Sequence, residues 1–476
     1  MYRTTADLPC HSVIRCDRQV ITDLKTDAIW RSLMAIDIRD FASLASGQDF
    51  QPAFRAALND LISQGGGELV VPKPASTDTY WIGRRETFSG IDFAGINVPI
   101  KIRGEGRTSR IGMLPSVDSS GSPVPTGDFY MFHIHDTHGS ISLENLCLFG
   151  NKDAFPVGQD EQTHLVQIRH ARDISFTNVW FEHSRGDGIK IVGDIGDDDL
   201  ASERINITSC HFLHNLRGGV LFQRLARRVF LTHNYFDGGF DSQIDFEPTG
   251  GAPSEEVVIA HNHIMHRHID RTSGLWVPTL SPAMTLANGH KLAVIGNLLE
   301  GGTIFGQNVQ EAAIIGNHVD GGAGPRGGIQ IVRAARDVSI VGNWVKTNAP
   351  EPAVALLFND GAAPENVIVA NNPHLEGRTG VNVTGGRRIK IHDNLIFENL
   401  HGATGVGVNI AATVEEINHV TVHDNYIKGF MFGVQLAAAN APISHVRIRA
   451  NDSEGAMEGA FRRSGSHPIE PLEHVP

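Results

Sequence analysis

A short phrase of alternating apolar and polar residues that ends in Asn recurs along the chain from residue 229 onwards. Apolar residues at every second position indicate a β-strand rather than a helix. The interval from one Asn to the next runs through 28, 35, 20, 26, 29, 22, 31 and 26 residues, which is typical of a solenoid. The copies lie at residues 229–234, 257–262, 292–297, 312–317, 338–343, 367–372, 389–394, 420–425 and 446–451.

A second alternating run precedes each Asn phrase by about ten residues. Alternate side chains of a strand point to opposite faces, so the apolar members of these runs are predicted to face the interior of the stack. Stacked coils would place each Asn above the Asn of the previous coil, and we expect an internal hydrogen-bonded ladder. The second runs include residues 132–135, 166–169, 189–191, 220–223, 244–247, 284–287, 304–307, 329–331, 381–383, 408–410 and 434–436.

The N-terminal part predicts a strand at residues 35–41, a helix that starts at Asp49, and further strands at 68–72 and 80–83. Asp49 is an N-cap candidate and Pro52 lies early in the helix, which the glycines at 65–67 end. The apolar residues Phe54, Ala57, Leu58, Leu61 and Ile62 fall at helical spacing. Because the first coil would expose a bare strand edge, we expect this helix to cover it.

The order of these elements resembles the N-terminal entry of pectate-lyase-like right-handed parallel β-helix proteins. The residues that carry the resemblance are 40–42, 47–49, 65–72, 79–82 and 101–106. The resemblance implies an all-β solenoid with an N-terminal segment and capping helix at 1–65, a right-handed parallel β-helix at 66–455 and a C-terminal tail at 456–476. The superfamily contains pectin-active hydrolases and lyases, glucanases, uronate epimerases and phage tailspikes, so the resemblance specifies activity weakly.

Composition is consistent with narrow coils, since the 476 residues include 51 glycines and 7% aromatic residues. The net charge of −13 argues against a general nucleic-acid or anionic-membrane surface. No apolar run of about twenty residues predicts a membrane span, and residues 1–7 lack the apolar region of a signal peptide, which leaves the compartment open. The four cysteines have no metal-ligand spacing, and Cys147 and Cys210 are predicted to be buried thiols.

Two carboxylates stand out in one second run, where Asp245 and Glu247 alternate with apolar Ile244 and Phe246. They are expected on one outer face with Cα atoms roughly 6.5–7 Å apart. Two like charges at this distance raise one pKa, which gives the protonated acid and ionised carboxylate that glycoside hydrolysis requires. The alternative is that both are ordinary solvated residues, which are common on the outside of solenoids.

Asp241 lies in the preceding glycine-bearing corner and is a further catalytic candidate. Such a corner carboxylate is also a candidate calcium ligand, as is Asp237, or it satisfies its own turn backbone. The neighbouring coils supply polar and aromatic residues for a saccharide groove. These substrate-binding candidates are Lys190, Asp187, Arg217, Gln223, Phe305 and Gln307.

The 35-residue interval after this pair contains an insertion rich in His, Arg and Trp, the mix expected of a loop that binds sugar rings and carboxylates. Its substrate-binding candidates are His266, Arg267 and Trp276, and His233 lies shortly before it. His266 and His268 with Asp270 form a weak metal motif, because no further spaced ligand accompanies them. We therefore expect no metal or other cofactor.

The first functional hypothesis is a glycoside hydrolase that acts on a polysaccharide or oligosaccharide with Asp245 and Glu247 as its carboxylate pair. The second is a polysaccharide lyase or uronate epimerase, whose base and cation would come from Lys190, Arg217, His233, His266 or Arg267. The third is a non-enzymatic, tailspike-like glycan-binding solenoid. A homotrimer is compatible with the polar outer face and is frequent in the superfamily that the chain resembles.

Overall fold

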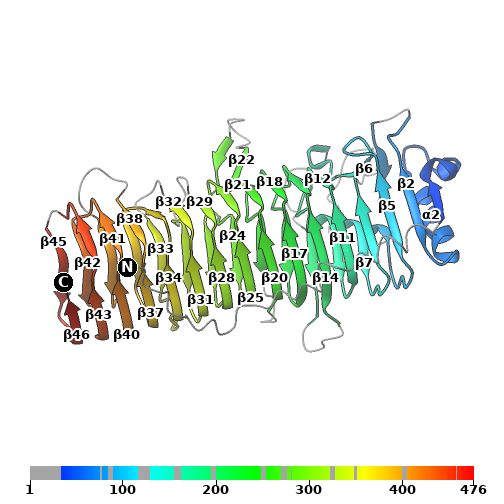
Figure 1. Ribbon diagram of the computed structural model, residues 1–476. Helices are drawn as coiled ribbons and strands as arrows, with labels where there is room; N and C mark the ends of the chain where they lie inside the picture. Colours follow the sequence, from blue (N-terminus) through cyan, green and yellow to red (C-terminus); the bar gives the residue numbers. More distant parts are fainter. Residues whose placement is uncertain are drawn as a thin grey trace, which may run out of the picture.

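The structure is a computed structural model, which describes residues 34–75, 78–83, 89–115, 129–154, 162–194, 200–247, 253–269, 276–279, 281–321, 327–347, 351–398, 405–456 and 458–475. Within these residues the chain winds into coils that stack in one direction (Figure 1). Each full coil contributes one strand to each of three parallel sheets, here named sheets A, B and C in the order in which the chain visits them. The predicted right-handed parallel β-helix is confirmed.

Sheet A contains the strands that precede the Asn residues. In stacking order they are β1 Ala35–Asp37, β2 Gly67–Val71, β5 Ile100–Gly104, β8 Ile141–Glu144, β11 Arg172–Thr177, β14 Ser202–Thr208, β17 Ala226–Thr232, β20 Glu255–Ala260, β25 His290–Ile295, β28 Gln310–Ile315, β31 Arg336–Val341, β34 Glu365–Ala370, β37 Gly386–His392, β40 Ile417–His423, β43 Ile443–Arg449 and β46 Ile469–Val475.

Sheet B contains short strands that directly follow sheet A. They are β3 Tyr80–Ile82, β6 Arg110–Met113, β9 Cys147–Phe149, β12 Trp180–Glu182, β15 His211–Leu213, β18 Tyr235–Asp237, β21 His263–Met265, β26 Leu298–Glu300, β29 His318–Asp320, β32 Trp344–Lys346, β35 His374–Glu376, β38 Leu395–Phe397, β41 Tyr426–Lys428 and β44 Asp452–Glu454.

Sheet C contains the strands predicted as the second run. They are β4 Ser89–Asp92, β7 Phe129–His135, β10 Thr163–Arg169, β13 Ile189–Val192, β16 Val220–Gln223, β19 Ile244–Glu247, β24 Met284–Ala287, β27 Ile304–Gln307, β30 Ile329–Val332, β33 Pro352–Leu357, β36 Thr379–Val383, β39 Val406–Ala411, β42 Phe432–Ala438 and β45 Gly459–Gly465.

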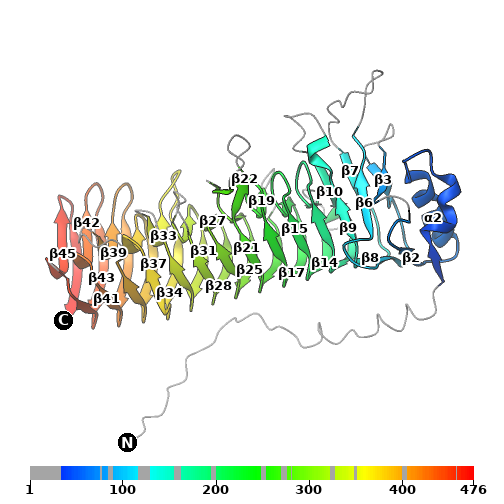
Figure 2. The ribbon, with the colours of Figure 1, turned by 90° about the horizontal axis from the view of Figure 1, so that it is seen from above.

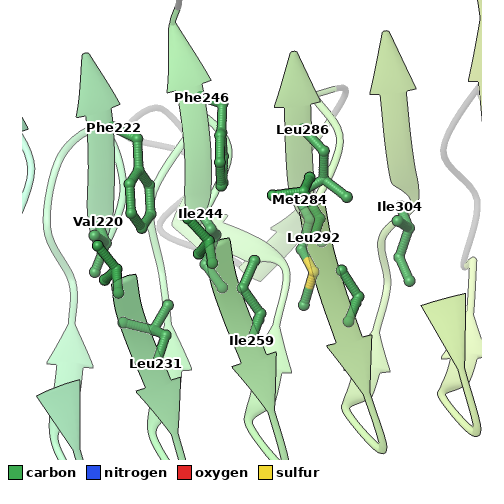
Figure 3. Close-up of a cluster of buried hydrophobic side chains, with 14 of the residues drawn as sticks. Val220, Phe222, Leu231, Ile244, Phe246, Ile259, Met284, Leu286, Leu292 and Ile304 are labelled. Carbon is green, nitrogen blue, oxygen red and sulfur yellow. The ribbon is translucent and has the colours of Figure 1, made fainter. Parts of the chain in front are cut away.

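The core is a set of apolar columns in which each side chain lies on its equivalent in the next coil. Ile244 pairs in register with Val220, and Phe246 pairs with Phe222, whose ring centroid is 4.4 Å away. Figure 3 shows these side chains directed into the space between the sheets, with Leu286 in the following coil. This stacking distance is close to the strand spacing of about 4.8 Å, so packing and backbone pairing impose the same register.

The Asn residues form the predicted ladder inside the stack, from Asn234 to Asn451. The side-chain amide of Asn234 donates to Oδ1 of Asn262 over 2.9 Å, and the backbone N–H of Asn234 donates to the same oxygen. Asn262 and Asn297 repeat this arrangement in the next coil. Each Asn therefore satisfies a buried backbone N–H of its neighbour and fixes the point at which the chain leaves sheet A.

One helix, α2 Gln51–Ser63, covers the N-terminal end of the stack (Figure 2). Its buried face includes Phe54, Leu58 and Leu61, which confirms the predicted capping helix. The helix starts after Phe50 rather than Asp49, but Oδ1 of Asp49 still accepts a hydrogen bond from the N–H of Gln51. Among the described residues no helix is long and apolar enough to cross a membrane.

Three features differ from the expectations. The strand predicted at 35–41 ends at Asp37, because the Asp37 side chain accepts from the N–H of Arg39 and caps a 3₁₀ helix, η2 Ile38–Leu44; a second, η3, spans Lys152–Ala154. Apart from β3, which the predicted strand at 80–83 matches, the strands of sheet B were not anticipated, since three residues with one inward apolar side chain give too short a pattern. Strands also continue beyond residue 455, where β45 and β46 pair with β42 and β43.

The ladder predicts a position-dependent cost for Asn substitutions. Asn297→Ala would leave the N–H of Asn262 without its acceptor and would remove the amide hydrogen bond to the carbonyl of Ile259, and we expect a loss of about 2–5 kcal/mol of unfolding free energy. Asn382→Ala, which removes a half-buried Asn pair on the outer face, should cost less than about 1.5 kcal/mol. Urea denaturation followed by circular dichroism measures both, and equal losses would contradict a stabilising role of the ladder.

Candidate active site on sheet C

The candidate site is built from three successive corners between sheets B and C and from strand β19. Residues 183–188, 214–219 and 238–243 form these corners, which contribute Asp187, Arg217 and Asp241. The N–H of Arg217 donates to the carbonyl of Gly186 over 3.3 Å, and the N–H of Asp241 donates to the carbonyl of Arg217 over 3.2 Å. The corners therefore stack in register and bring together residues that are 24 or more positions apart in the sequence.

Two glycines allow these corners to pack closely. A Cβ atom at Gly218 would lie 2.0 Å from the carbonyl oxygen of Ser242. Gly239 has a φ of +135°, and a Cβ atom at this position would lie only 2.5 Å from the carbonyl oxygen of Arg217. Larger residues would push the corners apart, so the glycine-bearing corner sequence is a requirement of the site geometry.

The guanidinium of Arg217 lies at the centre of four carboxylates. Its Nη2 is 2.5 Å from Oε1 of Glu247, 3.7 Å from Oδ2 of Asp241 and 4.0 Å from Oδ2 of Asp245. Its Nη1 is 4.0 Å from Oδ2 of Asp187. The Asp245 and Glu247 oxygens thus lie no more than 6.5 Å apart. One cation cannot neutralise four acids, so the cluster favours retention of a proton on one of them.

Asp245 is the group that this cluster keeps protonated. The residue is only 8% exposed, although it points away from the core. Burial raises the pKa of Asp245 to about 8, and the charges of Glu247, Asp241 and Asp187 add to the effect, which Arg217 partly opposes. Glu247 and Asp241 are more accessible, with side chains 39% and 33% exposed. The site therefore holds a buried acid beside accessible carboxylates that face a guanidinium.

Asp187 is in contact with a second buried residue, His164. The N–H of Asp187 donates to Nδ1 of His164 over 3.0 Å, and His164 is fully buried. Burial lowers the pKa of His164, and its contact with Asp187 opposes this shift. Asp187 was expected to contact substrate, but it is 2% exposed and is placed instead to add negative charge beneath the site.

The remaining candidates on sheet C flank the cluster. Lys190 precedes Leu221 and Asp245 in one column, which continues through Thr285 to Phe305. Lys190 donates to Oε1 of Gln162 over 3.0 Å. Gln223 is paired with Glu247, and Gln307 lies two residues from Phe305 on the same outer face. The strand register places these positions along one strip of sheet C, and their role in substrate binding stays a prediction.

The long insertion forms an antiparallel hairpin of β22 Arg267–Ile269 and β23 Trp276–Pro278, which projects from the stack (Figure 1). The hydroxyl of Thr279, directly after β23, donates to the carbonyl of Gly239, so the base of the hairpin lies beside the corner that carries Asp241. Arg267 is held by Asp237 through contacts of 3.0 and 2.9 Å. The side chains of Trp276 and His268, and all of Asp270, lie outside the described residues.

Two predicted residues are not brought into an accessible part of the site. His266 is 1% exposed, and its Nε2 lies 2.7 Å from the carbonyl oxygen of Ser281, so it anchors the insertion instead of facing solvent. His233 lies at the turn between sheets A and B, where its ring is 5.3 Å from that of His261. His266 is therefore shielded from solvent, and His233 lies outside the three corners that carry Asp187, Arg217 and Asp241.

The calcium hypothesis for the corner is not supported by the contacts of its carboxylates. The carboxylate of Asp237 forms an ion pair with the guanidinium of Arg267, and the carboxylate of Asp241 lies beside the guanidinium of Arg217. A cation bound there would have to compete with an existing positive charge.

One accessible aromatic residue was missed. Phe240, directly before Asp241, is 40% exposed, whereas Ile244 and Phe246, the other large apolar residues of this segment, are buried. An exposed aromatic ring is a surface on which a sugar ring can stack. Its position within the Gly238–Asp241 corner was the available signal in the sequence.

Comparisons with known proteins agree with the fold. The family model described as a right handed beta helix region matches residues 157–345. Among solved structures, the catalytic unit of a GH87 α-1,3-glucanase from Streptomyces thermodiastaticus is 16% identical, with a TM-score of 0.52 over 92% of this chain and 70% of that one.

A mannuronan C-5 epimerase A-module from Azotobacter vinelandii is 16% identical, with a TM-score of 0.34 over 91% of this chain and 98% of that one. A surface adhesin of Streptococcus pneumoniae is 13% identical, with a TM-score of 0.45 over 93% of each chain. No curated protein sequence matches the chain. At 16% identity, the similarity to the glucanase catalytic unit shows the fold alone.

The raised pKa of Asp245 predicts how stability depends on pH. Its folded pKa of about 8 lies above the unfolded value of about 3.9, so its contribution is complete at low pH and is lost as the pH rises towards 8. Asp245→Asn should therefore gain about 2–4 kcal/mol relative to the natural chain between pH 5 and pH 8. Urea midpoints at both pH values measure this change, with Glu311→Gln on sheet A as the control. Parallel pH profiles of the Asn variant and the natural chain would contradict the assignment.

Proposed function

We propose that the chain, a right-handed parallel β-helix protein of the pectate-lyase-like superfamily, hydrolyses glycosidic bonds of a polysaccharide or oligosaccharide at the carboxylate cluster around Asp245. The observation that carries the proposal is the pairing of a buried carboxyl group, whose pKa is raised to about 8, with the accessible carboxylate of Glu247 on the same strand. Glycoside hydrolysis requires a proton donor and a second carboxylate a few ångströms away, and here the oxygens of Asp245 and Glu247 lie no more than 6.5 Å apart.

Asp245 acts as the general acid in this mechanism. It retains its proton at neutral pH, because burial and the charges of Glu247, Asp241 and Asp187 disfavour a further negative charge. The proton passes from the Asp245 carboxyl to the glycosidic oxygen as the bond from that oxygen to the anomeric carbon breaks. The leaving sugar departs as an alcohol, and Asp245 becomes a carboxylate whose charge Arg217, 4.0 Å away, stabilises.

Glu247 acts at the anomeric carbon, either as a nucleophile or as the base that takes a proton from the attacking water. Its Oε1 accepts a hydrogen bond of 2.5 Å from Arg217, which orients the carboxylate, and its side chain is 39% exposed. Asp241 is the alternative for this role, since it lies 3.7 Å from the same guanidinium nitrogen.

The charge of the cluster favours a neutral glycan over a polyuronate. Asp187, Asp241 and Glu247 carry negative charge, while Arg217 and Lys190 supply two positive charges, so the site stays net negative with Asp245 protonated. Lyase or epimerase chemistry needs a cation to neutralise the uronate and a nearby base. Arg217 is already surrounded by carboxylates, Arg267 is bound to Asp237, and His266 is buried, which weakens that alternative.

Amide substitutions test the assigned roles. We expect Asp245→Asn and Glu247→Gln to fold and to lose activity by about 100-fold or more, because each removes one half of the acid–carboxylate pair. The matched control is Glu311→Gln, an exposed residue on sheet A that should keep full activity. Full activity of both site variants would place the chemistry elsewhere.

The reaction type is read from the products on a panel of neutral and acidic polysaccharides. We expect new reducing ends without the ultraviolet absorbance of unsaturated uronates. Rising absorbance would identify a lyase, and the absence of any product together with glycan binding would identify a non-enzymatic binder. Either result would contradict the proposed hydrolase.

A further inference from the structure

A second polar cluster lies on sheet C nearer the capping helix. His133 and His135 alternate along β7 with Phe132 and Ile134, which point into the core, and Asp92 of β4 is paired in register with His133. One candidate ligand atom from each of Asp92, His133 and His135 lies within 4.8 Å of the other two. Within the part of the chain that the structure describes, this is the one group of three such side chains with this proximity.

His135 lies between two carboxylates. Its Nδ1 is 2.8 Å from Oδ2 of Asp136, and its Nε2 is 2.9 Å from Oδ1 of Asp92. A neutral imidazole carries one N–H and can donate to only one of these acceptors. When Nδ1 carries that hydrogen and donates to Asp136, Nε2 presents a lone pair towards Asp92, as a metal ion bound between the two would require.

His133 presents the complementary feature. Its ring stacks on that of His135 at a centroid distance of 4.1 Å, and its Nε2 is buried without a hydrogen-bond partner. A buried ring nitrogen without a partner carries a free-energy cost that a ligand bound to it removes.

We propose that Asp92, His133 and His135 bind a divalent transition metal ion of the zinc class. Two imidazoles and one carboxylate form a common ligand set for such ions and leave at least one position for water or another oxygen donor. Metal–ligand bonds of about 2.1 Å place tetrahedral ligand atoms about 3.4 Å apart. The three side chains are already within 4.8 Å, so small rotamer adjustments complete the site.

A second layer of contacts positions His135. Asp136 accepts from Nδ1 of His135 and also contacts Nδ1 of His170 over 3.1 Å, while Nε2 of His170 is 2.9 Å from Asp194. Carboxylates that hold the remote nitrogen of a metal-binding His fix its tautomer and orientation. Asp136 therefore directs Nε2 of His135 towards Asp92, where the metal ion would bind.

This site is independent of the proposed hydrolase centre. His133 belongs to β7 and Asp245 to β19, which are four strands apart in sheet C, or about 19 Å along the stack. The metal ion would therefore contact neither Asp245 nor Glu247. Sequence spacing does not reveal this site, because Asp92 lies 41 residues before His133 and is brought to it by the stacking of two coils.

Zinc binding to the full chain tests the proposal. Isothermal titration calorimetry with Zn²⁺ should show one zinc ion bound per chain. Each of the variants His133→Gln, His135→Gln and Asp92→Asn should lower the zinc affinity by about 100-fold or more. Asp136→Asn, which removes only a positioning contact, should weaken it by about 10–100-fold. The control is the double variant His392→Gln, His423→Gln, which removes another stacked His pair with neighbouring Asp residues and should leave zinc binding unchanged.

A Co²⁺ titration supplies a second readout, because visible ligand-field bands report nitrogen and oxygen coordination and should vanish in the three ligand variants. If a histidine variant fails to fold, zinc binding by Asp92→Asn still tests the proposal, because Asp92 is exposed and its substitution should not disturb the core. Absence of tight zinc binding by the natural chain, or unchanged binding by folded Asp92→Asn, would overturn the proposal. Loss of hydrolase activity in Asp245→Asn with zinc binding intact would leave it standing.

Discussion

The stacking of one coil on the next in a fixed register is the constraint on which the rest of this structure depends. Parallel strand pairing sets the spacing, the apolar columns fill the interior, and the ladder from Asn234 to Asn451 determines where each coil turns. A slip of one residue would exchange the inner and outer faces of every strand in that coil. Any functional residue on the outside is therefore positioned by residues that point inward.

The carboxylate cluster illustrates this dependence. Ile244 and Phe246 pack on Val220 and Phe222, and the alternation between them directs Asp245 and Glu247 outward. Once outward, the two acids are separated from solvent to different extents by the corners of neighbouring coils. The resulting concentration of negative charge around Arg217 reduces stability near neutral pH, and the cooperative interior has to compensate for this local cost.

The sequence predicted those parts of the structure that repeat. A period of two, an invariant Asn position in each phrase and a helix before the first coil were enough for the architecture, the ladder and the outward direction of Asp245 and Glu247. The geometry of the corners could not be predicted from the sequence, because the contact of Asp187 with Arg217 and the burial of Asp245 depend on how loops of adjacent coils pack. The pairing of Asp92 with His133 was not predicted because β4, the strand that carries Asp92, was not among the predicted strands.

The central claim is that Asp245 holds a proton at neutral pH, and infrared spectroscopy tests it most directly. The difference spectrum of the natural chain minus Asp245→Asn at pH 7 should contain the C=O stretch of a protonated carboxylic acid. That band should disappear as the pH rises through about 8, the raised pKa of Asp245. A difference spectrum at pH 7 that contains only carboxylate bands would contradict the account.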